Sequence, residues 1–278
     1  MIYYKTKDEV ELIRKSSLLV SDTLAYVGSL IRPGITTLEL DKKAEEFIRD
    51  NGAAPAFKGY KSKSKGIPDF PASLCISMND VVVHGIPSKK EIGEKDVVSV
   101  DCGVLKNGFY GDSAYTFLMG GVSLDVVNLA RITKESLYRG IEMAIAGNRV
   151  GDISHAVQHF CENINGYGVV RELVGHGLGK SLHEEPEVPN FGAKGKGPKL
   201  LEGLVIAIEP MVNLGTKNVM QDADGWTIRT RDGKAACHFE HTIAVRKGPA
   251  DILSAFEQIE SAERNNHNLY KQLQSVNG

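Results

Sequence analysis

Apolar residues recur every three or four positions, with charged residues between them, in two pairs of segments along the chain. This spacing buries one face of an α-helix and therefore predicts helices. The predicted helices cover residues 7–30, 38–50, 125–146 and 152–164. Pro33-Gly34 follows the first helix and ends it. Thr37 and Asp152 are the expected N-caps of the second and fourth helices.

Runs rich in β-branched residues lie between and after these helices and predict strands. The runs cover residues 74–77, 81–84, 97–105, 109–117, 169–174, 204–213, 226–229 and 238–246. Asn107-Gly108 separates two of them and is typical of a two-residue hairpin turn. We therefore expect an α/β (α+β) fold in which helices cover one face of a mostly antiparallel sheet.

The order of these elements occurs twice. Val97–Asp101 and Val205–Glu209 are both apolar strands that end in an acid, and a His-Gly pair precedes each of them. The repeat predicts a duplicated chain with two halves, about 1–120 and 121–248, related by a pseudo-twofold axis. Such an axis would bring both acids to a shared centre.

The two halves together form the expected single catalytic domain, 1–248. Residues 249–278 place a few apolar residues, including Ile252, Phe256 and Ile259, in a polar background. This pattern predicts a helical extension at the C-terminus.

The composition of the chain excludes some classes of function but adds little to the prediction of the fold. The 278 residues carry 33 Lys and Arg against 35 Asp and Glu, a net charge of −2, which does not favour direct binding to nucleic acid. No stretch reaches the ~18 apolar residues of a transmembrane helix, and the first residues lack the apolar core of a secretory signal. The 4 cysteines are scattered, which suits a reducing compartment. We expect a cytoplasmic protein without a membrane partner.

Asp101 and Asp112 flank the predicted hairpin turn. In a two-residue hairpin Asp101 lies opposite Ala114, so Asp112 is on the same face and diagonal to Asp101. Carboxylates placed in this way repel each other unless a cation lies between them. Two solvated acids on an edge hairpin are the alternative, but Asp101 ends a run of valines.

Glu209 and Glu240 are two further acids within apolar, strand-like sequence. With Asp101 and Asp112 they would carry four negative charges, which two divalent cations balance. Oxygen ligands with one imidazole and no thiolate suit Mn²⁺, Fe²⁺ or Co²⁺, with Zn²⁺ as an alternative. Two such ions activate a bridging water. The four acids therefore predict metal-assisted hydrolysis of an acyl bond.

Two histidines stand near glycine-rich sequence. His176 lies within Gly175–Gly179, where the backbone bends freely and a substrate approaches closely. His183 follows seven positions later. An odd separation predicts the opposite face of a regular strand, and hence a different role. The histidines expected to be structural are His155, His159, His238, His241 and His267.

Five motifs follow one another in a fixed order. They are Ser77–Asp80 with His84-Gly85, Asp101 with Asp112, Gly175–Gly177 with His183-Glu184, Ile208–Met211, and Asp224–Thr227 with Glu240–Thr242. Across about residues 1–248 the chain resembles the type I, bacterial-type methionine aminopeptidases of the M24 metallopeptidase family. The resemblance implies the pita-bread fold. It also implies removal of the initiator methionine from nascent proteins and peptides with a small second residue.

The resemblance also implies a role for each site residue. The ligands of two divalent ions (Co, Mn, Fe or Zn) would be Asp101, Asp112, His176, Glu209 and Glu240. Glu209 matches the proton shuttle, His84 the contact to the substrate amide nitrogen, and His183 the group near the scissile carbonyl oxygen. The methionine side-chain pocket would be formed by Tyr60, Phe70, Cys75, Leu182 and Trp226. The implied partner is a nascent polypeptide N-terminus, with the ribosome as a candidate, and the expected state is a monomer.

The chain departs from the family pattern in two places. Lys61–Asp69 is longer than the usual link at this point and is expected to form a mobile basic loop at the pocket rim. Leu182 stands where an aromatic residue is common. Two other functions stay open: a proline-specific peptidase of the prolidase or aminopeptidase P kind, and a metal-free binding module with the same fold.

Overall fold

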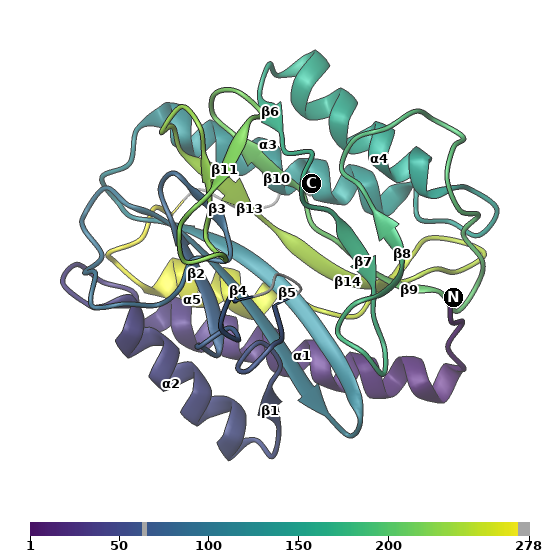
Figure 1. Cartoon of the computed structure of the whole chain (residues 1–278), viewed down its shortest axis with the longest axis horizontal. Helices are drawn as coiled ribbons and strands as arrows, with labels where there is room; N and C mark the ends of the chain where they lie inside the picture. The colour runs from purple at the N-terminus through teal and green to yellow at the C-terminus, as the bar shows by residue number, and fades with distance from the viewer. Residues whose placement is uncertain (63–65, 272–278) are drawn as a thin grey trace.

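The structure of the chain is a computed structural model that describes residues 1–62 and 66–271. Its helices are α1 (Lys7–Leu30), α2 (Thr37–Asp50), α3 (Leu124–Glu142), α4 (Val150–Gln158), the π-helical segment η1 (His159–Ile164) that continues α4, and α5 (Glu257–Asn265). In Figure 1, α1, α2 and α5 lie together at the bottom of the view, and α3 and α4 lie at the top. The four predicted helices are therefore present, in two pairs.

A nine-stranded sheet runs between these groups of helices (Figure 1). Its main path is β1 (Ala54–Pro55), β4 (Val97–Lys106), β5 (Phe109–Leu118), β14 (Glu240–Ala244), β9 (Val205–Ile208), β7 (Gly175–Gly177) and β8 (Glu184–Val188). Off this path, β2 (Leu74–Met78) pairs with β4 and β15 (Asp251–Ile252) with β14. All these pairs are antiparallel, as predicted.

Two small sheets complete the strand structure. One has the order β13 (Ala236–His238), β10 (Met211–Asn213) and β6 (Gly168–Val169), and the other β11 (Val219–Gln221), β12 (Ile228–Thr230) and β3 (Val81–Val83). The predicted run 169–174 is therefore wrong as one strand. The chain bends after β6, where Arg171 turns toward Glu162 and forms an ion pair of 2.7 Å.

The strand order shows the predicted pseudo-twofold arrangement. β5 and β14 are neighbours at its centre, with β4 outside β5 and β9 outside β14. Asp101 lies on β4, and Glu209 directly follows β9. The two acid-ending strands therefore approach the centre from opposite sides.

Two helix starts differ from the prediction. Thr36, and not Thr37, caps α2, because its side chain accepts a hydrogen bond from the Glu39 N–H and Glu39 bonds back to the Thr36 N–H. This reciprocal capping box satisfies two free backbone donors. Asp152 is likewise not the N-cap of α4. It lies in the first turn, and its carboxylate accepts from the Arg149 N–H at 2.8 Å.

The C-terminal segment contains a shorter helix than predicted, since α5 ends at Asn265 and residues 272–278 lie outside the described part of the chain. Phe256, Ile259 and Leu269 are nevertheless buried in the same hydrophobic cluster as both halves of the chain. The segment therefore packs into the main core.

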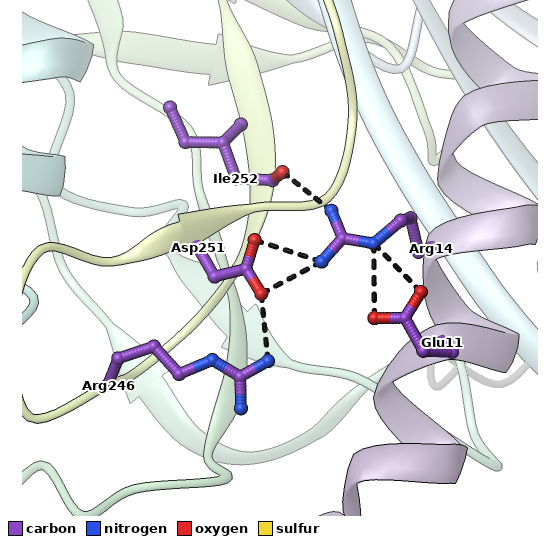
Figure 2. Close-up of polar contacts among 5 residues, drawn as sticks. All are labelled: Glu11, Arg14, Arg246, Asp251 and Ile252. Atoms are coloured by element: carbon purple, nitrogen blue, oxygen red, sulfur yellow. Dashed lines mark hydrogen bonds and ion pairs between the residues drawn. The ribbon is translucent and has the colours of Figure 1, made fainter.

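Polar contacts attach this segment to α1 (Figure 2). Both carboxylate oxygens of Asp251 accept hydrogen bonds from Arg14, at 2.9 and 2.8 Å, and Arg14 also donates to the Ile252 carbonyl. Arg246 donates to Asp251 from the other side, and Glu11 pairs with Arg14 on α1. One guanidinium nitrogen of Arg14, Nη2, makes both bonds to Asp251, and these charge-assisted contacts join the C-terminal segment to α1. In the described residues, no helix combines the length and apolar character needed to cross a membrane.

Candidate metal centre and substrate pocket

A cavity of about 590 Å³ opens at the centre of the sheet. Every residue that the sequence predicts for the site lines this cavity: Tyr60, Phe70, Cys75, His84, Asp101, Asp112, His176, Leu182, His183, Glu209, Trp226 and Glu240. They come from both halves of the chain. The fold therefore brings the predicted set to one place.

The β4–β5 hairpin positions the first two acids as predicted. Asn107 and Gly108 both have positive φ, 54° and 78°, which is the backbone of a two-residue turn. Asp101 consequently lies opposite Ala114. On the other side of β5, Glu240 of β14 lies opposite the same Ala114. Asp101, Asp112 and Glu240 therefore share one face of three adjacent strands.

Asp112 and Glu240 are buried, Asp101 and Glu209 are partly buried, and in the described part of the chain three of the four carboxyl groups have an unpaired oxygen. Asp101 Oδ1, Asp112 Oδ1 and Glu240 Oε1 have no hydrogen-bond partner among the described residues. Burial raises the pKa of Asp101 and of Glu209 to about 7. Burial and the neighbouring carboxylates raise the pKa of Asp112 and of Glu240 well above the usual range. Buried, unpaired acids are stabilised when a cation neutralises them, so this donor set fits divalent metal ions.

His176 presents one nitrogen to these acids. Its Nδ1 lies 3.0 Å from the Gly177 carbonyl, which only accepts, so Nδ1 carries the proton. Nε2, which carries the lone pair in the neutral form of such a ring, lies 3.6 Å from Glu209 Oε1 and 3.8 Å from Asp112 Oδ2. A second hydrogen bond that fixes the tautomer is usual for a histidine that ligates a metal. Asp112, His176 and Glu240 form one compact group of potential ligands.

His183 lies beside His176, with ring centroids 4.2 Å apart, although the two residues were predicted to face opposite ways. The prediction assumed one regular strand between them. The chain instead leaves β7 after Gly177 and turns before β8 begins at Glu184, so the strand period does not apply. His183 Nδ1 shares a hydrogen bond of 2.7 Å with the Tyr60 hydroxyl.

His84 is held in a left-handed backbone conformation, with φ of 57°, which is uncommon for a residue with a side chain. Gly85 follows and pairs with β2, where a side chain would collide with the Ile76 carbonyl. Burial lowers the pKa of His84 to about 4, so its imidazole is neutral at pH 7. His84 therefore offers the cavity a neutral imidazole.

The sequence model of metallopeptidase family M24 matches residues 11–247. The chain belongs to metallopeptidase family M24. Divalent metal use, predicted from the acids, is confirmed by this membership together with the compact ligand groups.

Relatives of this M24 chain agree with the resemblance read from its motifs. The chain is 49% identical over 254 residues to a methionine aminopeptidase of Clostridium perfringens, and the match covers 91% of this chain and 99% of the relative. The crystal structure of a methionine aminopeptidase from Thermotoga maritima superposes with a TM-score of 0.87 at 40% identity, covering 91% and 99% of the two chains. A prolidase from Pyrococcus furiosus, at 24% identity and a TM-score of 0.71, covers 91% of this chain and 66% of the prolidase and shares the fold. The pita-bread fold and the resemblance to methionine aminopeptidases are confirmed.

The apolar wall of the M24 site is a separate cluster. Phe70, Cys75 and Leu182 are buried together with Phe57, which the sequence analysis missed, and Tyr60 and Trp226 pack against them. Phe70 and Trp226 meet edge to face, with ring centroids 5.4 Å apart. Rings in this arrangement form a stable surface for an aliphatic or thioether side chain.

The insertion Lys61–Asp69 borders this wall, although residues 63–65 of the predicted mobile loop lie outside the described residues. The Trp226 indole N–H donates to the Pro68 carbonyl at 2.9 Å. Ile67 covers Gly225, where φ is 77° and any side chain would collide with it. The described end of the insertion therefore packs on the Trp226 turn.

His238, which was expected to be structural, lies beside the acids. This residue is 1% exposed, and both of its ring nitrogens lack a hydrogen-bond partner within the described residues. Its Nε2 lies 3.6 Å from Glu209 Oε2. The available signal was its position two residues before Glu240, which places both side chains on one face of the chain, with Phe239 in the core between them.

Proposed function

We propose that the chain removes N-terminal methionine from peptides and nascent proteins whose second residue is small. The observation that supports this most directly is the shape of the cavity. Its floor carries the four acids, and its wall is an apolar cluster with Phe70 and Trp226. An unbranched apolar side chain in that cluster would hold the first peptide bond over the acids. The relatives at 40% identity or more described above bear the name methionine aminopeptidase.

The proposed metal ligands are Asp101, Asp112, His176, Glu209 and Glu240, holding two divalent ions. Two ions match the four negative charges of the acids, and Co²⁺, Mn²⁺, Fe²⁺ and Zn²⁺ all suit oxygen ligands with a neutral imidazole. When bound, such ions lower the pKa of a water to near neutrality and polarise a carbonyl.

Glu209 is the proposed proton shuttle. Burial raises the pKa of its carboxyl group to about 7 in the metal-free protein. Once it contacts a metal ion the group would be ionised, so it would be able to accept a proton. It would take a proton from the attacking water and give it to the leaving amine. The Asn190 side chain donates to the Glu209 main-chain carbonyl at 3.0 Å and so holds the backbone of this residue.

Two histidines are proposed to hold the reacting amide. With the Tyr60 hydroxyl donating to Nδ1, the His183 Nε2 would carry the proton and would donate it in a hydrogen bond to the developing oxyanion. His84 would bond the substrate amide nitrogen with its neutral imidazole. Neither residue is a proposed metal ligand. Their loss is therefore expected to affect turnover and not metal content.

A peptide assay tests the proposal. The chain is stripped of metal and then assayed with and without Mn²⁺ or Co²⁺ on Met-Ala-Ser, Leu-Ala-Ser, Met-Lys-Ser and an X-Pro peptide. Metal-dependent release of methionine from Met-Ala-Ser, well above the other three peptides, is expected. Cleavage of the X-Pro peptide alone would assign the chain to the prolidase kind. No cleavage and no metal uptake would identify a binding module.

A further inference from the structure

His238 occupies a place in the metal centre that the proposed ligand set does not include. Glu209, His238 and Glu240 form a second compact group of potential ligands, beside the group of Asp112, His176 and Glu240. Glu240 belongs to both groups. Each of the two overlapping groups therefore contains one histidine.

The distances from Glu209 are equal on its two sides. His176 Nε2 lies 3.6 Å from Oε1, and His238 Nε2 lies 3.6 Å from Oε2. This separation is too long for a hydrogen bond. It is close to the separation of about 3.4 Å expected of two atoms that each lie about 2.1 Å from the same ion at a tetrahedral angle. Glu209 thus lies between two imidazoles at ligand-to-ligand spacing.

The described residues around His238 offer its imidazole ring no hydrogen-bond partner. Within the described chain neither ring nitrogen has a hydrogen-bond partner, and the residue is 1% exposed. Buried polar groups without a partner are rare because their desolvation is not compensated. A bound cation would compensate it.

The backbone of His238 is held firmly. The Thr116 hydroxyl donates to the His238 carbonyl at 2.7 Å and accepts from the His238 N–H at 3.0 Å. Ser99 Oγ lies 2.7 Å from the same Thr116 oxygen. Neighbouring strands β4 and β5 therefore fix the point from which the imidazole reaches the acids.

We propose that His238 is a sixth protein ligand of the metal centre, binding through Nε2 the ion that Glu209 and Glu240 also contact. The inference rests on the proposed two-ion centre. It gives each ion one imidazole. A nitrogen donor at the second position favours borderline ions such as Fe²⁺, Co²⁺ and Zn²⁺ over Mn²⁺, so the chain would fill that position with Co²⁺ more readily than with Mn²⁺.

The first test counts imidazoles in the parent protein. X-ray absorption of protein loaded with two equivalents of Co²⁺ should show an average of one imidazole for each ion. The five-ligand set gives half that number. A count of one imidazole for two ions would overturn the proposal without any variant.

The second test compares His238→Gln with His241→Gln. His241 is also buried, but its Nδ1 bonds to the Ser254 hydroxyl and it lies outside both ligand groups. We expect His238→Gln to weaken the second equivalent of Co²⁺ by at least ~10-fold, the loss seen even for groups that only support a ligand, and to change Mn²⁺ binding less. His241→Gln should leave both Co²⁺ affinities unchanged, and circular dichroism checks that both variants fold.

The outcomes separate this proposal from the proposed function. Unchanged binding of the second Co²⁺ equivalent in folded His238→Gln refutes the ligand role, whether or not the parent releases methionine. Binding of a single Co²⁺ equivalent by the parent also refutes it. Failure of the parent to cleave Met-Ala-Ser, with His238-dependent binding intact, refutes the function alone.

Discussion

Metal binding to this protein should release protons, because the acids that would hold the ions are protonated to a large extent without them. Burial raises the pKa of Asp101 and of Glu209 to about 7. A metal ligand must be ionised. At pH 7 each of these two groups is about half protonated, so together they give up about one proton. Any protons held by Asp112 and Glu240, whose pKa values are also raised, add to that number.

The pH dependence follows from the same values. With a pKa of about 7, the apo carboxyl is about nine-tenths protonated at pH 6 and about one-tenth at pH 8. The contribution of Asp101 and Glu209 to proton release should therefore fall by about 1.6 protons between these pH values. The cost of ionising both groups weakens metal affinity at pH 6 by on the order of 100-fold relative to pH 8.

Isothermal titration with Mn²⁺ or Co²⁺ in buffers of different ionisation enthalpy measures the release directly. The heat of binding should vary with buffer more strongly at pH 6 than at pH 8. A binding heat independent of buffer at pH 6, together with affinities that differ by less than about threefold between pH 6 and pH 8, would refute the reasoning. It would mean that the acids are ionised in the metal-free protein.

Three further predictions follow from particular contacts. His183→Ala should lower kcat on Met-Ala-Ser by about 10²–10³, the usual loss for one oxyanion donor, and should retain both metals. His176→Ala should instead weaken metal binding. Metal titration and steady-state kinetics measure both effects, and loss of an ion from His183→Ala would contradict the separate roles of the two histidines. Shortening Lys61–Asp69 to two residues should change KM for long peptides more than kcat on a tripeptide. The reason is that the described part of the insertion contacts Trp226 and not the acids. A lower kcat on the tripeptide at unchanged KM would show that the loop organises the site. Burial raises the pKa of Glu263 to about 7, so its stabilising contribution is complete below its unfolded pKa and is lost as pH rises to about 7. Glu263→Gln should therefore gain up to ~3 kcal/mol relative to the parent between pH 4.5 and pH 8, and equal stability differences at the two pH values in urea unfolding would exclude this effect.

Local sequence determined a large part of the site. Asn107-Gly108 allows one turn geometry, and the two-residue period of a strand then decides which side chains lie opposite each other. The register of Asp101 with Ala114 could therefore be derived without coordinates, and the structure agrees with it. The duplicated strand-and-acid pattern likewise indicated that the acids of β4 and β9 approach a shared centre from opposite sides, because similar local patterns form similar local elements, and β5 and β14 lie between these two strands.

Local sequence also has a limit at the ends of elements. The capping position of α2 shifted by one residue because Thr36 and Thr37 are equally suitable by type, and only Glu39 reaching back selects between them. The run 169–174 continues as a strand only to Val169, and Arg171 forms an ion pair with Glu162 beyond that point. In both cases a particular side-chain contact, and not the type of residue, accompanies the end of the element.

The tertiary structure alone placed the histidines. His176 and His183 come together because the chain turns between β7 and β8, and the turn replaces the strand period on which the prediction relied. His238 carries no motif of its own. It reaches the acids only because β13 leads into β14 beside β5, where Thr116 holds its backbone. Periodicity records which face of its own strand a side chain occupies, whereas distances between strands depend on turns and packing that no short segment of sequence contains.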